Sequence, residues 1–292
     1  MTTQPSALAV SGELARRRQR RRIVGELLFY LFLLVTGVVC LLPLLWMFVN
    51  AFKEQWEIVN VPMVWFPAYP RYDNFLYVLE RSLIAAGYRN SLITVPTVTL
   101  IQVFTSIIGG YAFAKLRFPG RELLFIGVLS ALMLPGFLIQ IPLFVMVVQL
   151  EWLNTYQAMI VPFLFTPFGI FLMRQFISGV PTEYLDSARI DGSSEIGLIW
   201  RIVFPLVKEA AAALSIFIFI AHWNNLFWPL LVLRQRDMFT LPLALFTLTG
   251  DYGTYYHHIL AGATLGILPV VIIYLFFQEH IVRGVTLTGL KG

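Results

Sequence analysis

The chain has few charged residues and almost no cysteine. Of its 292 residues, 13% are charged and Cys40 is the only cysteine. A single cysteine excludes a disulfide or a thiolate metal site within the chain, so we assign Cys40 to packing. Hydrophobic residues make up 58% and the mean hydropathy is +0.77, which is too apolar for a soluble globule with one core. The composition therefore indicates a polytopic membrane protein.

The chain also lacks the parts of a nucleotide-hydrolysing or metal-dependent enzyme. Gly192 and Gly197 have the glycine spacing of a phosphate-binding loop, but Leu198 stands where that motif requires lysine. His257 and His258 are adjacent, and no cysteine or acid pair nearby completes a metal site. We therefore predict no catalytic residue, no metal site and no cofactor bound by this chain.

Long apolar segments set the fold class. About 20 helical residues cross a hydrocarbon core of about 30 Å, and the segments lack the alternation of barrel strands. Pro135 and Gly136 predict a break in the third segment. We predict an all-α polytopic membrane protein with six transmembrane helices, at residues 27–50, 91–113, 123–148, 156–176, 210–233 and 259–278.

The basic residues are distributed unevenly between the two sides of these segments. Six arginines between residues 16 and 22 immediately precede the first span. By the positive-inside rule, both termini lie in the cytoplasm. We expect residues 1–26 to form a basic cytoplasmic tail, with residues 1–12 disordered, and residues 280–292 to form a second tail. Arginines beside a span indicate topology or contact with anionic membrane lipid rather than nucleic acid.

Ionisable groups are scarce within the predicted spans. Glu26 and Glu279 lie at span ends, and His222 alone is too little to form a proton relay across the membrane. Secondary carriers driven by protons or sodium ions place ionisable groups near the membrane midplane. An ion-coupled carrier of a small polar solute is therefore the alternative rather than the first choice. A solute channel and an assembly scaffold without transport also stay open.

One polar segment, residues 181–205, interrupts this apolar chain. Its apolar residues recur at three- and four-residue steps, which predicts two short amphipathic helices. Gly192 can adopt positive φ between them, and acids such as Glu183 and Glu195 suit helix N-termini. We expect Pro205 to end the second helix.

This segment resembles the EAA loop of bacterial ABC importer permeases, in which E-A-A is followed by D-G and a closing L-P. The corresponding residues are Asp186-Ser187-Ala188, Asp191-Gly192 and Phe204-Pro205, so Asp186 and Ser187 depart from the pattern. The resemblance extends to YAFAKLRFPGR at 111–121, and to HWNNLFWPL at 222–230. It continues in the tail VRGVTLTGLKG, which is similar to the ending of maltose-type permeases.

The resemblance implies a type I ABC importer transmembrane domain at residues 86–279, with residues 27–50 as an additional first helix. Its coupling loop, 177–208, would dock on an ATPase through Tyr184, Leu185, Ala188 and Ile196, while Asp186 and Asp191 orient it. The resemblance assigns to this loop Glu183, Tyr184, Leu185, Asp186, Ser187, Ala188, Asp191, Gly192, Glu195, Ile196 and Pro205.

The same resemblance implies a set of partners. These are two copies of an ATPase that uses ATP and Mg, a second homologous permease and an extracytoplasmic solute-binding protein. The location would be a bacterial or archaeal cytoplasmic (inner) membrane, and the cargo a sugar or oligosaccharide.

Polar and aromatic residues within the spans are candidates for contact with the transported solute. Sugars need hydrogen-bonding edges and aromatic faces, although the same side chains also serve helix packing. The candidates are Gln102, Gln140, Trp223, Asn224, Asn225 and Trp228.

Overall fold

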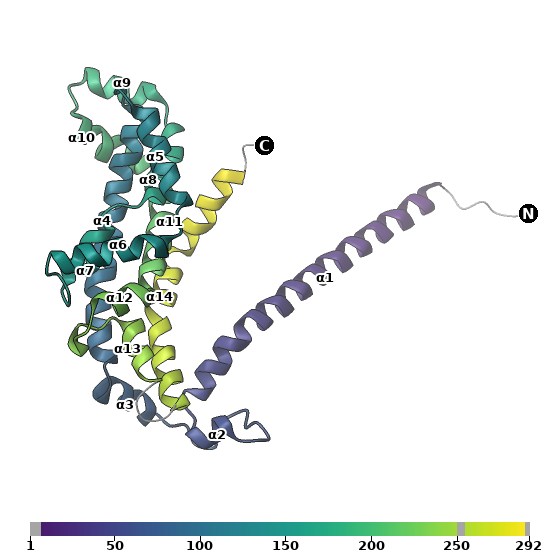
Figure 1. Cartoon of the computed structure of the whole chain (residues 1–292). Helices are drawn as coiled ribbons and strands as arrows, with labels where there is room; N and C mark the ends of the chain where they lie inside the picture. The colour runs from purple at the N-terminus through teal and green to yellow at the C-terminus, as the bar shows by residue number, and fades with distance from the viewer. Residues whose placement is uncertain (1–6, 250–254, 290–292) are drawn as a thin grey trace, which may run out of the picture.

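The computed structural model describes residues 7–249 and 255–289, and this part of the chain is helical with connecting turns (Figure 1). The longer helices are α1 (Ala7–Asn50), α3 (Asp73–Arg81), α4 (Ile84–Lys115), α5 (Arg121–Met133), α6 (Gly136–Gln149), α8 (Pro167–Ser178), α9 (Thr182–Ile190), α11 (Phe204–Trp223) and α14 (Tyr256–Gly289). The shorter ones are α2 (Gln55–Val59), α7 (Tyr156–Ile160), α10 (Glu195–Leu198), α12 (Phe227–Val232) and α13 (Leu241–Thr247), with 3-10 or π turns at Val161–Phe163, Ile199–Val203 and Arg236–Met238.

The helices account for the predicted membrane spans. Within residues 7–249 and 255–289, four continuous helical stretches are long and apolar enough to cross a bilayer: Arg22–Asn50, Ile84–Lys115, Glu195–Trp223 and Tyr256–Gln278. Two bent pairs, α5 with α6 and α7 with α8, bring the total to six when each pair counts as one span. The α5–α6 bend of 101° lies at the predicted Pro135-Gly136 break. The structure thus confirms the all-α, six-span fold class.

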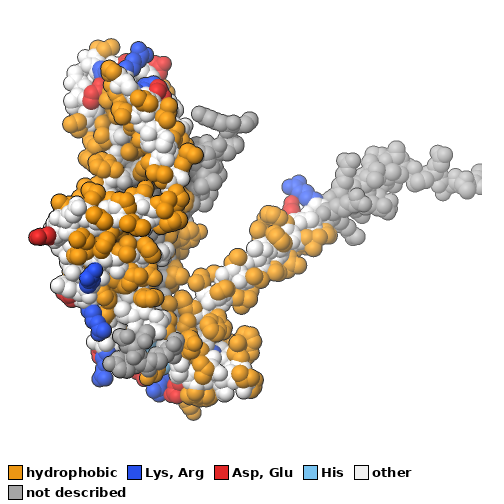
Figure 2. Space-filling model, in the orientation of Figure 1, with side chains coloured by type: hydrophobic (Ala, Val, Ile, Leu, Met, Phe, Trp, Pro, Cys, Tyr) orange, Lys and Arg blue, Asp and Glu red, His pale blue; other side chains and the backbone are white. Residues whose placement is uncertain are grey.

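Helix α1 diverges from the rest of the molecule (Figure 1). Its side chains between Ile23 and Phe48 are largely exposed and apolar, which suits a helix surrounded by lipid (Figure 2). The disorder expected for residues 1–12 is wrong for residues 7–12, where α1 has already begun. Alanine, leucine, glutamate and arginine are strong helix formers, so the basic segment extends the spanning helix. Residues 1–6 lie outside the described part.

Helix α4 is the centre of the bundle. Helices α8 and α11 pack along it, and α14 packs along α11. Glycines allow the closest approach: a Cβ at Gly110 would lie 2.6 Å from the Cβ of Met173, and one at Gly169 would lie 2.1 Å from the Oγ of Ser106. The bundle places α9 and α10 at one end and α2 and α3 at the opposite end (Figure 1).

The fifth span, predicted at residues 210–233, begins and ends earlier in the structure, at Glu195 and Trp223. Pro205 does not end the helix, because helical geometry runs from Glu195 to Trp223. The π turn Ile199–Val203 precedes the proline, and the N–H of Phe204 bonds to the Ile199 carbonyl five residues earlier. This wider turn accommodates a ring that lacks an N–H. The predicted span 210–233 instead ends at Trp223, and the short helix α12 follows after a turn.

Candidate functional site

The corner between α9 and α10 forms as its sequence predicts. Gly192 adopts a φ of +83°, and its N–H donates to the Arg189 carbonyl at 3.0 Å. The N–H of Ser193 reaches back to the Ala188 carbonyl at 2.9 Å, which completes a Schellman-type helix end. Ser194 then caps α10, because its Oγ accepts a hydrogen bond from the N–H of Gly197 at 3.2 Å.

The predicted apolar stripe of this corner has two faces. Leu185 is fully buried in a cluster under the corner, so the expectation that it faces an ATPase is wrong. Ala188 is half-buried and packs against the same cluster. Tyr184 and Ile196 face outward and are 57% and 71% exposed. Ile190, which the motif did not single out, is 87% exposed. We call Tyr184, Ile190 and Ile196 the outward apolar patch.

An ion-pair network holds the two helices of the corner together. The guanidinium of Arg189 donates to Asp186 at 2.9 Å, and to Glu195 at 3.0 Å. It also donates to the hydroxyl of Tyr111 on α4 at 3.3 Å. The hydrogen bond to Glu195 raises the pKa of Arg189 above its ordinary value. Arg189 and Tyr111 were not predicted as site residues, because an ion pair across a turn and a tyrosine 78 positions away leave no local signal.

The remaining predicted loop residues are at the surface or in the helix. Glu183 and Ser187 are exposed on α9, where the Ser187 hydroxyl donates to the Glu183 carbonyl at 2.8 Å. Asp191 and Gly192 line an open hollow of about 600 Å³ with Ile196, Trp200 and Arg201. Charged side chains gather at this end of the bundle, whereas its sides are largely hydrophobic (Figure 2). The corner therefore combines the Arg189 ion-pair network, the outward apolar patch and an adjacent open hollow.

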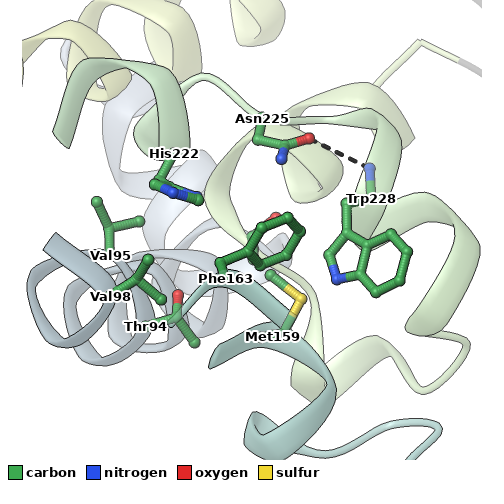
Figure 3. A pocket seen from close by; sticks show the side chains of 9 residues that line it. Thr94, Val95, Val98, Met159, Phe163, His222, Asn225 and Trp228 are labelled. Atoms are coloured by element: carbon green, nitrogen blue, oxygen red, sulfur yellow. Dashed lines mark hydrogen bonds between the residues drawn. The ribbon is translucent and has the colours of Figure 1, made fainter. Parts of the chain in front are cut away.

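The candidate solute-contacting residues fall into separate places. Asn225 and Trp228 line a small cavity with His222, and the Oδ1 of Asn225 accepts a bond from the backbone N–H of Trp228 at 3.2 Å (Figure 3). Gln102 lies next to this cavity; its Nε2 donates to the Phe163 carbonyl at 2.6 Å and lies 3.3 Å from the Nε2 of His222. The cavity has room for about one water molecule at 10 Å³.

The other candidates lie elsewhere. Trp223 and Asn224 line a hollow of about 350 Å³ between α11, α13 and α14. Trp223 is buried and donates to the Gly266 carbonyl at 3.1 Å, whereas Asn224 is exposed. Trp228 is also buried and donates to the Ala158 carbonyl at 2.9 Å. Gln140 lies on α6 and lines neither hollow. In this conformation both indoles pack within the protein.

Comparison with known proteins decides the family. The family model "Binding-protein-dependent transport system inner membrane component" matches residues 7–287. The chain belongs to this family. A member is a permease subunit of an ABC importer and is not an enzyme, since ATP is hydrolysed by a separate chain. Its place is the inner membrane, which it crosses several times, and its partners include an ATPase and a solute-binding protein.

Relatives of this permease carry carbohydrate names. It is 38% identical over 258 residues to the arabinooligosaccharides transport system permease protein AraQ of Halalkalibacterium halodurans, covering 87% of this chain and 92% of the relative. It is 30% identical over 278 residues to the trehalose/maltose transport system permease protein MalG of Thermococcus litoralis, covering 94% and 99%. None of these findings supports the ion-coupled alternative.

A solved structure shares the fold of this permease. A chain of a bacterial ABC transporter involved in the import of the acidic polysaccharide alginate superposes with a TM-score of 0.77. The two sequences are 20% identical, and the match covers 95% of this chain and 99% of the other. The likeness confirms the type I importer architecture expected from the EAA-like segment.

Proposed function

We propose that this permease carries a sugar or oligosaccharide that a solute-binding protein delivers, and that it converts ATPase closure into opening of the membrane path. The observation that carries the proposal is the α9–α10 corner. Its outward apolar patch, Tyr184, Ile190 and Ile196, lies on a frame fixed by Arg189, as a docking surface requires. The carbohydrate names of the relatives support the cargo class.

The same corner supports a proposed assembly. One permease of this type presents one docking corner, so two ATPase copies require a second, homologous permease beside it. ATP and Mg are used by the ATPase copies, and this chain binds no cofactor. The corner and both termini lie in the cytoplasm. Basic residues support this orientation, because Lys115 and Arg174 lie at the α9–α10 end, where they bond to the backbone of Val180 and Phe113.

Solute contact is proposed for Gln102, Gln140, Trp223, Asn224, Asn225 and Trp228. Of these, Asn224 is exposed in a hollow of about 350 Å³ and needs no rearrangement to meet a solute. The indoles of Trp223 and Trp228 would first have to leave their buried positions.

Uptake by cells that produce the complete importer tests this function. Labelled arabino-oligosaccharide, maltose and alginate oligosaccharide would be supplied in turn, with ATP depleted in one arm and the proton gradient collapsed in another. We expect uptake of at least one carbohydrate that stops with ATP depletion and survives loss of the gradient. Uptake that follows the gradient instead would contradict the proposal and favour an ion-coupled carrier.

A further inference from the structure

One tyrosine hydroxyl joins three helices beneath the docking corner. Tyr111 lies in the last two turns of α4 and is 1% exposed. Its hydroxyl donates to the Oε2 of Glu195 at the start of α10. The same oxygen accepts a bond from Arg189 near the end of α9 at 3.3 Å. Neither helix of the corner can shift relative to α4 without breaking one of these two bonds.

A second attachment lies one turn further along α4. The Nζ of Lys115 donates to the carbonyl of Val180, two residues before the start of α9, at 2.6 Å. Leu185 and Leu198 belong with Tyr111 to one buried apolar cluster. The corner is therefore held on the end of α4 by two sets of polar bonds and by a shared apolar cluster.

The opposite end of α4 is attached to the first residue of α13 and to the segment before it. The Nδ2 of Asn90 donates to the carbonyls of Asp237 and Phe239 at 2.8 and 2.9 Å. The Oγ of Ser91 accepts a bond from the N–H of Leu241 at 2.9 Å. Helix α4 has 32 residues and a length of about 48 Å at 1.5 Å per residue, so it joins the docking corner to this far segment.

We propose that Tyr111 is a positioning residue for coupling: with Glu195 and Arg189 it latches the docking corner to α4, so that the corner and this helix move as one body when the ATPase closes. The motion then reaches the start of α13 and the segment before it through the Ser91 and Asn90 bonds at the far end of α4. The inference rests on the proposed function, because it assumes that an ATPase acts on the corner.

The polar part of the latch can be removed without emptying the core. Tyr111→Phe keeps the buried ring and loses only the hydroxyl, and Glu195→Gln keeps the shape while losing the charge. Tyr88→Phe is the matched control, since Tyr88 also lies on α4 and its hydroxyl donates to the Leu265 carbonyl, far from the corner. Loss of one hydrogen bond to a charged group is expected to raise the unlatched population by about tenfold.

The test uses the complete complex with its partner permease and ATPase in nanodiscs. Nitroxide labels are placed at Thr182→Cys on α9 and Leu100→Cys on α4, both exposed, in a Cys40→Ser background. The distance between the labels is measured by pulsed electron spin resonance without nucleotide and after trapping with ATP and vanadate. Solute uptake per ATP hydrolysed is recorded for the same unlabelled variants.

For wild type and Tyr88→Phe we expect one distance that does not change on trapping. For Tyr111→Phe and Glu195→Gln we expect a second distance after trapping and fewer solute molecules carried per ATP. A single, unchanged distance in Tyr111→Phe with normal uptake per ATP would overturn the latch. Failure of the proposed function has a different signature: no ATPase would assemble with the wild-type chain at all.

Discussion

Leu185 and Ile190 lie five residues apart on α9. We expect truncation of Leu185 to lower the stability of the chain, and truncation of Ile190 to weaken the binding of the ATPase. Leu185 is fully buried under the corner, and Ile190 is 87% exposed. Leu185→Ala opens a cavity in the apolar cluster and is expected to lower the free energy of unfolding by about 2–5 kcal/mol. Ile190→Ala leaves no cavity, so its effect on the free energy of unfolding is expected to stay within about 0.5 kcal/mol.

ATPase affinity should respond in the opposite way, because Ile190→Ala should weaken binding more than Leu185→Ala does. Burying an isoleucine side chain in a docking groove contributes about 1.5–3 kcal/mol, and most of this is lost on truncation to alanine. A loss of about 2 kcal/mol corresponds to a dissociation constant about 30-fold higher. Thermal unfolding of the chain in detergent gives the first quantity, and titration of the purified ATPase onto the chain in nanodiscs gives the second.

An Ile190→Ala variant that is destabilised but binds the ATPase with normal affinity would contradict the outward position of Ile190. A Leu185→Ala variant that lowers the affinity without changing the midpoint of unfolding would contradict the burial of Leu185, because Leu185 would then face the partner. Tyr184→Ala and Ile196→Ala should each behave as Ile190→Ala does, since both side chains belong to the same outward apolar patch.

Further predictions concern three other sites, each read by thermal unfolding. Gly110→Ala should lower the free energy of unfolding by about 1–3 kcal/mol, because the added Cβ would lie 2.6 Å from the Cβ of Met173. Gly127→Ala, which has open space around it, should be neutral or slightly stabilising. Equal effects of the two substitutions would contradict the close packing of α4 and α8. Gly192→Val should cost more than about 1 kcal/mol at a φ of +83°, and Gly192→Asn should retain most of the stability. Trp228→Phe leaves a buried carbonyl unpaired and should cost about 1–3 kcal/mol; no change would mean that water replaces the indole.

Local and periodic features of the fold could be predicted from the sequence. Apolar runs of spanning length located the six spans, and Pro135-Gly136 located the sharp bend between α5 and α6. Gly192 located the helix reversal, because positive φ is a property of a single residue. Such features depend on a few neighbouring residues, so no knowledge of tertiary packing is needed.

Other features depend on distant residues and could not be predicted. A three- and four-residue repeat marks an apolar stripe, but it does not say whether Leu185 packs on its own chain or on a partner. The continuation of the helix past Pro205 depends on a π turn that no sequence periodicity marks. The bond between Tyr111 and Glu195 joins positions 84 apart, which only the folded bundle brings together.

Copurification of an ATPase with this chain from its native membrane tests whether the α9–α10 corner is the docking site. The wild type would be compared with Ile190→Asp and with Val61→Asp, an equally exposed apolar position in the segment between α2 and α3. We predict ATPase activity in the eluates of the wild type and Val61→Asp, and its loss with Ile190→Asp. ATPase activity that is absent from all three eluates, or retained with Ile190→Asp, would contradict the assignment of the α9–α10 corner as the docking site.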